Sequence, residues 1–173
     1  MNETSPPPSD MHMRSRLLAI LHRADHNIYL FVNELFAEIG LTFQQAVVTS
    51  FIYHNKGCNQ RAIEDHIETR SASVTALLAT MVSKGLVEKT RNPVDGREVA
   101  LALTPKGRKT AARVQAVFEK TTQVVTRGMS EDDIDTLKRL LVTMSDNCVA
   151  ASPSRSARIS ARMSARLAAQ GEA

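Results

Sequence analysis

One short segment with the character of β-strands interrupts a sequence that otherwise has the periodicity of helices. Residue types typical of strands fill LVEKT (86–90) and EVALAL (98–103), and RNPVDGR (91–97) joins them. The Asp-Gly pair in the joining segment is a strong turn signal. The pattern predicts a two-stranded hairpin with Arg97 at its tip. Because two strands alone are only marginally stable, we expect the hairpin to pack against neighbouring helices.

Helical periodicity accounts for most of the chain before the hairpin. A long helix is expected from Met11 to about Ile39, because apolar residues recur three and four positions apart along it. Thr42 and Gln45 form a capping box that starts a second helix, which ends at NKG (55–57). The apolar stripe of the long helix consists of Leu17, Leu21, Ala24, Ile28, Phe31 and Leu35.

Two shorter helices come next, separated by a turn. Asn59 can cap QRAIEDHI (60–67), and ASVTALLATMVSK (72–84) forms the second of the pair and ends at Gly85. A solvent-facing helix side normally carries Lys, Glu and Arg, but the outer side of this second helix has small residues. Such a face predicts close approach to a large partner surface. The side expected to be buried contains Val74, Leu77, Leu78, Met81 and Val82. The small-residue side contains Ser71, Ser73, Thr75, Ala76 and Thr80.

Two further helices follow the hairpin. Thr104 and Pro105 suit the cap and first position of a helix that runs to Gly128. Ser130 and Asp133 form a second capping box, which starts the last helix. The apolar face of that helix consists of Ile134, Leu137, Leu141, Met144 and Cys148, and we expect Cys148 to lie in the core.

Positive charge is concentrated in the middle of the chain and in its tail. Residues 56–113 carry a net charge of +5 and residues 152–173 carry +3, whereas residues 1–55 and 114–151 each carry −2. This asymmetry favours a face that binds a polyanion, with an ordinary solvated surface as the alternative. The tail spaces its arginines three and four apart, which suits a marginal helix that orders on contact with a partner.

Composition excludes several classes of function. No apolar run approaches the roughly 20 residues of a membrane span, and the N-terminus lacks the features of a secretory signal, so we expect a cytoplasmic protein. The chain has no Trp and 4% aromatic residues, which argues against a surface that binds single-stranded nucleic acid by stacking its bases on aromatic side chains. Cys58 and Cys148 form no metal-type pair. No catalytic motif is recognisable, so we predict neither an enzyme nor a cofactor.

The order of elements defines a mostly α fold with a short β-hairpin. A helix-turn-helix followed directly by a hairpin is a winged helix. In such modules the second short helix enters the DNA major groove. The hairpin tip can reach the neighbouring minor groove, whose negative potential attracts arginine. We therefore predict that Arg97 is carried to double-stranded DNA.

The residues themselves support a more specific interpretation. SVTALLATMVSKGLVEKTRNPVDGREVALALTPKG (73–107) resembles the recognition helix and wing of MarR-type transcriptional regulators. The match rests on V-T before apolar pairs, K-G-L-V, T-R, D-x-R and a strand that ends in L-T-x-K-G, and the resemblance extends over about residues 14–149. It implies a homodimer that pairs its N- and C-terminal helices on pseudo-palindromic DNA. It also implies release of DNA when a small molecule binds between the dimerisation and DNA-binding parts.

This resemblance gives the predicted organisation, a winged helix-turn-helix flanked by long dimerisation helices. The parts are a disordered tail (1–10), a regulator domain (11–151) and a basic tail (152–173). Within the domain, dimerisation helices occupy 11–55 and 114–151, and the DNA-binding module occupies 56–113.

Position by position, Arg97 matches the family's wing-tip arginine, Arg91 matches its wing-base arginine, and residues 71–76 match the start of its recognition helix. Family members often have a longer polar residue where this chain has Ala76. We therefore expect base reading by Ser and Thr contacts, thymine methyl groups and DNA shape, with Arg70 as a candidate guanine reader. The predicted DNA-binding residues are Arg70, Ser71, Ser73, Val74, Thr75, Ala76, Thr80, Arg91 and Arg97.

Competing interpretations remain for the basic residues. Arg97 could lie in a solvated turn, and Arg91 could form an ion pair with Asp65 or Glu68 that holds the base of the wing. The start of the helix after the hairpin could reach phosphate or simply face solvent. Its basic residues are Lys106, Arg108, Lys109 and Arg113.

A polar stripe runs along the long first helix beside its apolar stripe. It contains His22, Asp25, His26, Tyr29 and Asn33. The most specific interpretation is that His22, Asp25, His26 and Tyr29 form the wall of an effector site. A polar seam in a dimer interface is the alternative, and His22 with His26 could also hold a metal, although we predict no metal site. Cys58 precedes a helix start, where a thiolate gains some stabilisation, so redox sensing is a minor alternative.

Two other functions are compatible with the same fold. The winged helix could contact a protein, with the arginine tail as a tether to nucleic acid. The chain could also bind an effector without any affinity for DNA.

Overall fold

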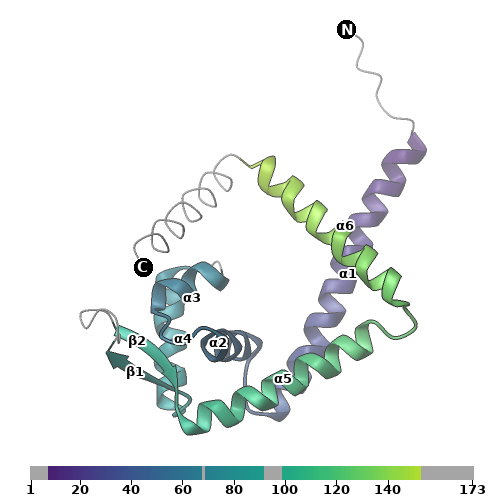
Figure 1. Ribbon diagram of the computed structural model, residues 1–173. Coiled ribbons are helices and arrows are strands. Elements are labelled where there is room, and N and C mark those ends of the chain that lie inside the picture. Colours follow the sequence, from purple (N-terminus) through teal and green to yellow (C-terminus); the bar gives the residue numbers. More distant parts are fainter. Residues whose placement is uncertain (1–7, 68, 92–98, 153–173) are drawn as a thin grey trace. The chain divides into compact units, whose positions relative to one another are not determined.

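The computed structural model describes the backbone of residues 8–67, 69–91 and 99–152 (Figure 1). Contacts divide the chain into two units, Met1–Val125 and Thr126–Ala173. The first unit holds α1 (Pro8–Glu38), α2 (Phe43–His54), α3 (Gln60–Ile67), α4 (Ser71–Ser83), β1 (Val87–Arg91), β2 (Val99–Leu103) and α5 (Pro105–Val125). The second unit holds α6 (Glu131–Ala150). The mostly helical fold with an antiparallel hairpin is confirmed.

Side-chain caps start the helices where the sequence predicted them. Gln45 N–H donates to Thr42 Oγ1 and Thr42 N–H donates to Gln45 Oε1, both at 3.3 Å, which completes the capping box of α2. Asn59 Oδ1 accepts from Ala62 N–H at 2.9 Å and caps α3. Ser130 and Asp133 form the predicted box at α6. Each cap satisfies a backbone donor that the first turn leaves without an intrahelical partner.

The start of α1 differs from the prediction. The helix begins at Pro8, ahead of the expected Met11, so residues 8–10 are helical and do not belong to a disordered tail. Proline is well suited to a first helical position, because it has no N–H to satisfy and its φ is already near the helical value.

The hairpin packs against the helices through its base. Val87 pairs with Leu103 and Arg91 pairs with Val99 in an antiparallel register. Val87, Leu101 and Leu103 are buried, and Leu101 N–H donates to Cys58 O at 2.8 Å in the loop before α3. The base is therefore part of the core, as expected, while the tip at 92–98, including Arg97, lies outside the described residues.

The core of the first unit draws on every one of its elements. Helix α2 contacts α1, α3, α5 and β2, and it passes between them in Figure 1. Burial is complete or nearly so for one or more side chains from each element. They include Phe36, Val48, Ile63, Val74, Met81, Val87, Leu101 and Val114.

The apolar stripe of α1 and the predicted buried side of α4 are only partly buried. The stripe of α1 is exposed toward its N-terminus, with Leu17 52% and Ile28 37% accessible, and its buried part is at Val32, Leu35 and Phe36. Helix α1 packs against α2 and α5, and its buried side chains all lie in its C-terminal part. Val82 of α4 is 39% exposed and was wrongly placed in the core, because it lies at the edge of the stripe formed by Val74, Leu78 and Met81.

Helix α6, in the second unit, has no buried residue. Leu137 and Leu141 of its predicted apolar face are 40% and 41% exposed. Cys148 is exposed as well, so its assignment to the core was wrong for this single chain. The apolar face exists as the sequence predicted, but nothing described within this chain covers it.

Among the described residues, no single helix is long and apolar enough to cross a membrane. In this described part, only α1 from Arg16 taken together with α2, across a 75° bend, has the length and composition of a membrane span.

A close contact fixes where α5 begins relative to the hairpin. Thr104 Oγ1 donates to Gly85 O at 2.7 Å and accepts from Gly107 N–H at 3.0 Å. Thr104 N–H also donates to Leu86 O at 3.1 Å. This arrangement brings the backbone of α5 so near the backbone of Leu86 that a Cβ at Gly107 would lie 2.0 Å from Leu86 O.

We therefore expect Gly107→Ala to destabilise the fold by about 2–3 kcal/mol, the cost typical of forcing extra volume into a packed site. Urea unfolding followed by circular dichroism measures this change. Lys109→Ala, at an exposed position of the same helix, is the control and should leave stability within about 0.5 kcal/mol of wild type. Equal stability of Gly107→Ala and wild type would show that the contact is not tight in solution.

Candidate nucleic-acid interface

Helix α4 has one buried side and one accessible side. Val74, Leu78 and Met81 are buried against the core. The opposite side is exposed and consists of the predicted small residues, Ser71, Ser73, Thr75, Ala76 and Thr80. Together with α3 and the turn between them, this helix forms a helix-turn-helix whose outer face lacks long side chains.

Val74 is the one predicted DNA-binding residue of α4 that the fold removes from the surface. Its side chain is completely buried. Val74 therefore anchors α4 to the core, and its methyl groups are not available to a thymine. Arg70, which precedes the helix as its N-cap residue without a side-chain cap bond, is exposed.

A hydrogen-bond network joins α3 to the start of α4, and sequence reasoning did not find it. Gln60 Nε2 donates to Glu64 Oε1 at 2.9 Å and to Thr75 Oγ1 at 2.8 Å. Ser71 Oγ donates to Glu64 Oε1 at 2.6 Å and accepts from Gln60 Nε2 at 3.4 Å. The available signal was the spacing of Gln60 and Glu64, four apart on one helix face. Two predicted DNA contacts are thus already tied to neighbouring side chains.

The network also affects the charge of its acid. The hydrogen bond from Ser71, and then the one from Gln60, lowers the pKa of Glu64 below its usual range. Both bonds favour the ionised carboxylate, because its charged oxygen is a stronger acceptor than an oxygen of the protonated acid. Glu64 is therefore negatively charged at neutral pH, next to the outer face of α4.

Three basic side chains donate to acceptors within the chain. Lys84 Nζ, just after α4, donates to Gly40 O and Gln45 Oε1, each at 3.0 Å. Lys106 Nζ donates to Lys84 O and Arg108 Nη1 donates to Leu103 O, each at 2.7 Å. Lys106 and Arg108 were expected either to reach phosphate or to face solvent; both are exposed, and each also donates to a backbone carbonyl.

The two predicted wing arginines lie at the end of the described part of the hairpin and beyond it. The backbone of Arg91 pairs with Val99 at the end of the described ladder. The side chain of Arg91, all of Arg97, and Glu68 lie outside the described residues. The roles of both arginines, including an ion pair between Arg91 and an acid of α3, therefore stay predictions.

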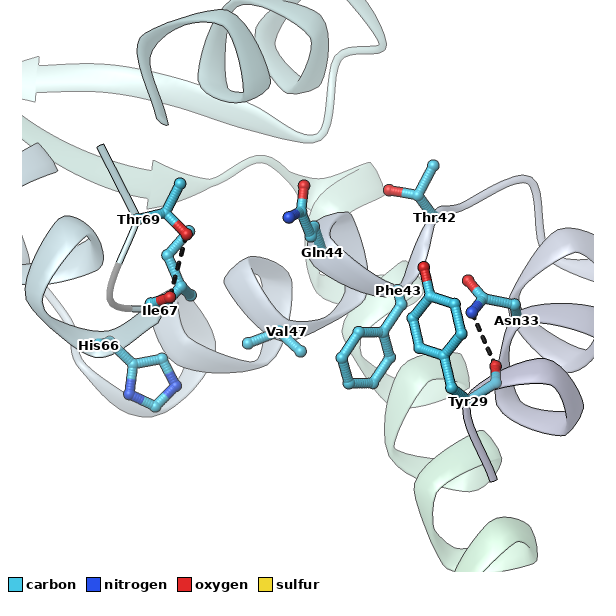
Figure 2. Close-up of a pocket in the computed structure, with 9 residues that line it drawn as sticks. All are labelled: Tyr29, Asn33, Thr42, Phe43, Gln44, Val47, His66, Ile67 and Thr69. Atoms are coloured by element: carbon cyan, nitrogen blue, oxygen red, sulfur yellow. Dashed lines mark hydrogen bonds between the residues drawn. The ribbon is translucent and has the colours of Figure 1, made fainter. Parts of the chain in front are cut away.

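A pocket of about 800 Å³ opens beside α2 (Figure 2). Its wall on α1 includes Tyr29 and Asn33, and Asn33 Nδ2 donates to Tyr29 O at 2.7 Å. The Tyr29 ring meets the Phe43 ring edge-on, with centroids 6.0 Å apart. The remaining lining residues come from the start of α2 and from the end of α3 with the segment after it. They are Thr42, Gln44, Val47, His66, Ile67 and Thr69.

The polar stripe of α1 reaches this pocket only at its C-terminal end. Tyr29 and Asn33 line the pocket, whereas His22, Asp25 and His26 are exposed and are not among its lining residues. Within the part of the chain that the structure describes, no group of three His, Cys, Asp or Glu side chains is arranged to hold a metal.

Cys58 lies half-buried in the loop before α3. Burial raises the pKa of its thiol. A redox-sensing cysteine needs the opposite shift, because the thiolate is the reactive form. The environment of Cys58 therefore argues against the redox alternative.

The geometry defines a class of protein: a winged helix-turn-helix module whose second short helix presents an accessible face for DNA. A family model described as "MarR family" matches residues 39–98. The regulator MgrA of Staphylococcus aureus is 25% identical over 135 residues, which cover 77% of this chain and 90% of MgrA.

Solved structures of such regulators have a similar fold. A mutant MarR from E. coli, complexed with operator DNA, matches with a TM-score of 0.66 at 25% identity, covering 81% of this chain and 99% of that chain. BpsR of Bordetella bronchiseptica, whose DNA binding is regulated by 6-hydroxynicotinic acid, matches with a TM-score of 0.65 at 23% identity. The match covers 74% of this chain and 91% of the BpsR chain. The chain is thus similar in sequence and in fold to MarR-type winged-helix transcriptional regulators.

Proposed function

We propose that this protein is a MarR-type transcriptional regulator, a homodimeric repressor that reads a pseudo-palindromic operator. Helix α4 of each protomer enters the major groove, and Arg97 of each wing enters the adjacent minor groove. The observation that carries the proposal is the exposed small-residue face of α4, opposite a fully buried Val74. The operator-bound MarR structure supports this mode of binding.

The small side chains let the backbone of α4 approach the base edges closely. Hydroxyl groups can bond to any base pair, and small apolar groups contact thymine methyls. The proposed contacts on or next to α4 are Arg70, Ser71, Ser73, Thr75, Ala76 and Thr80. Arg91 and Arg97 join them on the strength of the family resemblance.

The exposed apolar faces of two helices support a dimer. Leu17, Leu18 and Ile20 of α1 are 52–64% exposed. In the second unit, the middle of α6 exposes a group of apolar residues, namely Leu137, Leu140, Leu141 and Val142. Contiguous exposed apolar surface of this kind marks an interface. A two-fold dimer would place its recognition helices about 34 Å apart, one turn of DNA.

The pocket beside α2 is the proposed effector site. Its volume falls within the roughly 300–1,000 Å³ common for small-molecule sites. Thr42 and Gln44, which line the pocket, lie in the chain between Gly40 and Gln45. Gly40 O and Gln45 Oε1 accept hydrogen bonds from Lys84 Nζ, just after α4. A ligand that shifts this segment would move α4 and so change the spacing between the two recognition helices. The ligand-regulated DNA binding of BpsR supports such a coupling.

Arg97→Ala should weaken operator binding by roughly tenfold, since each dimer loses two minor-groove contacts. A gel-shift titration at two salt concentrations measures the loss. Arg127→Ala, in the second unit and outside the DNA-binding module, is the matched control and should bind like wild type. Unchanged operator affinity of Arg97→Ala would contradict the wing assignment. Binding that lacks sequence preference altogether would favour the alternative of a protein-contact module with a basic tether.

Gln44→Trp should block the effector site, because Gln44 lines the pocket and its side chain is exposed. A thermal-shift screen of small aromatic compounds against wild type provides the assay, since saturating ligand at 100 times Kd stabilises by about 2.7 kcal/mol. We expect the hits to lose their stabilising effect on Gln44→Trp and to keep it on Tyr53→Trp, an exposed position of α2 outside the pocket. Hits that stabilise both variants equally bind elsewhere.

A further inference from the structure

The network between α3 and α4 decides how two hydroxyl groups use their protons. A hydroxyl group has one proton to donate and two lone pairs that accept. Serine and threonine can therefore bond to donors or to acceptors on a base edge, and alone they discriminate poorly. A fixed neighbour that takes or supplies a proton removes this ambiguity.

Ser71 gives its proton to Glu64. The Oγ to Oε1 distance of 2.6 Å is that of a strong, charge-assisted bond to a carboxylate. Ionised Glu64 has no proton to give back. What Ser71 presents to a groove is consequently a lone pair, which suits an amino group on a base.

Thr75 has the opposite polarity. Its Oγ1 accepts from Gln60 Nε2 at 2.8 Å, so within this network its own proton is left to donate. Gln60 is itself oriented by its bond to Glu64 at 2.9 Å, which prevents the amide from turning its carbonyl oxygen toward Thr75. One carboxylate thus sets the polarity of both hydroxyl groups.

We propose that Glu64, together with Gln60, positions Ser71 as an acceptor and Thr75 as a donor and thereby determines the base preference of α4. The proposal rests on the proposed DNA-binding mode and adds to it two residues that do not touch the bases. Ser71 would favour adenine or cytosine, which carry amino groups in the major groove, and Thr75 would favour a guanine or thymine oxygen.

The same carboxylate has a second effect that does not depend on sequence. A negative charge beside the DNA-facing side repels phosphates and weakens binding to any duplex. Removal of the charge should therefore tighten binding to unrelated DNA while it reduces base preference. An ordinary structural residue would not produce these opposite changes.

Selection from a random DNA pool, followed by sequencing, tests the proposal on the full-length dimer. Wild type should select a motif with adenine or cytosine strongly preferred at one position of each half-site. Glu64→Gln should reduce that preference by about tenfold, the scale of one good base contact, and should bind unrelated DNA a few-fold more tightly. Glu64 is at the surface and the exchange keeps its shape, so the thermal midpoint serves to confirm folding.

Two further variants isolate the role of Ser71 and of the charge. Ser71→Ala should lose preference at the same position, and the double variant should lose no more than either single variant. Glu88→Gln, an exposed acid on β1, makes the same charge change and should keep the wild-type motif.

Different failures have different meanings. If Glu64→Gln selects the wild-type motif unchanged, or if Ser71→Ala affects another position, the positioning role is wrong although the function stands. If wild type selects no motif, the proposed function fails, and this inference fails with it.

Discussion

The burial of one side of α4 is the constraint on which the rest of the molecule depends. Val74, Leu78 and Met81 pack into a core that draws on α1, α2, α3, α5 and the hairpin. Since these three side chains cannot leave the core without exposing apolar surface, the rotation of the helix about its axis is fixed. The side that remains outside is the small-residue face, and the proposed DNA-binding mode follows from that orientation.

Short polar contacts set the remaining degrees of freedom around α4. Lys84 connects the end of the helix to the turn between α1 and α2, and Glu64 connects its start to α3. At the base of the hairpin, the contact of Gly107 with the backbone of Leu86 locates the start of α5. Helix α4 is therefore held at both ends by groups that also define the neighbouring elements.

Local sequence signals were sufficient for most of the fold. Caps at Thr42, Asn59 and Ser130 depend on residues within three positions of each other, and all three are present. The hairpin strands matched their predicted ranges to within one residue, because alternation and turn chemistry are equally local. Periodicity also identified the accessible side of α4.

The errors arose where tertiary packing overrides periodicity. An apolar stripe shows which side of a helix is apolar but not how much of its length has a partner within the chain, so Cys148, expected in the core, proved to be exposed. The network of Gln60, Glu64, Ser71 and Thr75 could not be predicted, because it depends on how two helices cross. The polar stripe of α1 was found, yet only Tyr29 and Asn33 of it reach the pocket for the same reason.

The most direct test of the account is a binding titration of the wild-type protein on DNA from upstream of its own gene. Random DNA serves as competitor, at two salt concentrations. Tight binding that prefers the upstream DNA and weakens steeply with salt is the predicted result, because phosphate contacts supply affinity and α4 supplies selectivity. Equally weak binding to both DNAs would contradict the assignment of α4 as the helix that reads an operator.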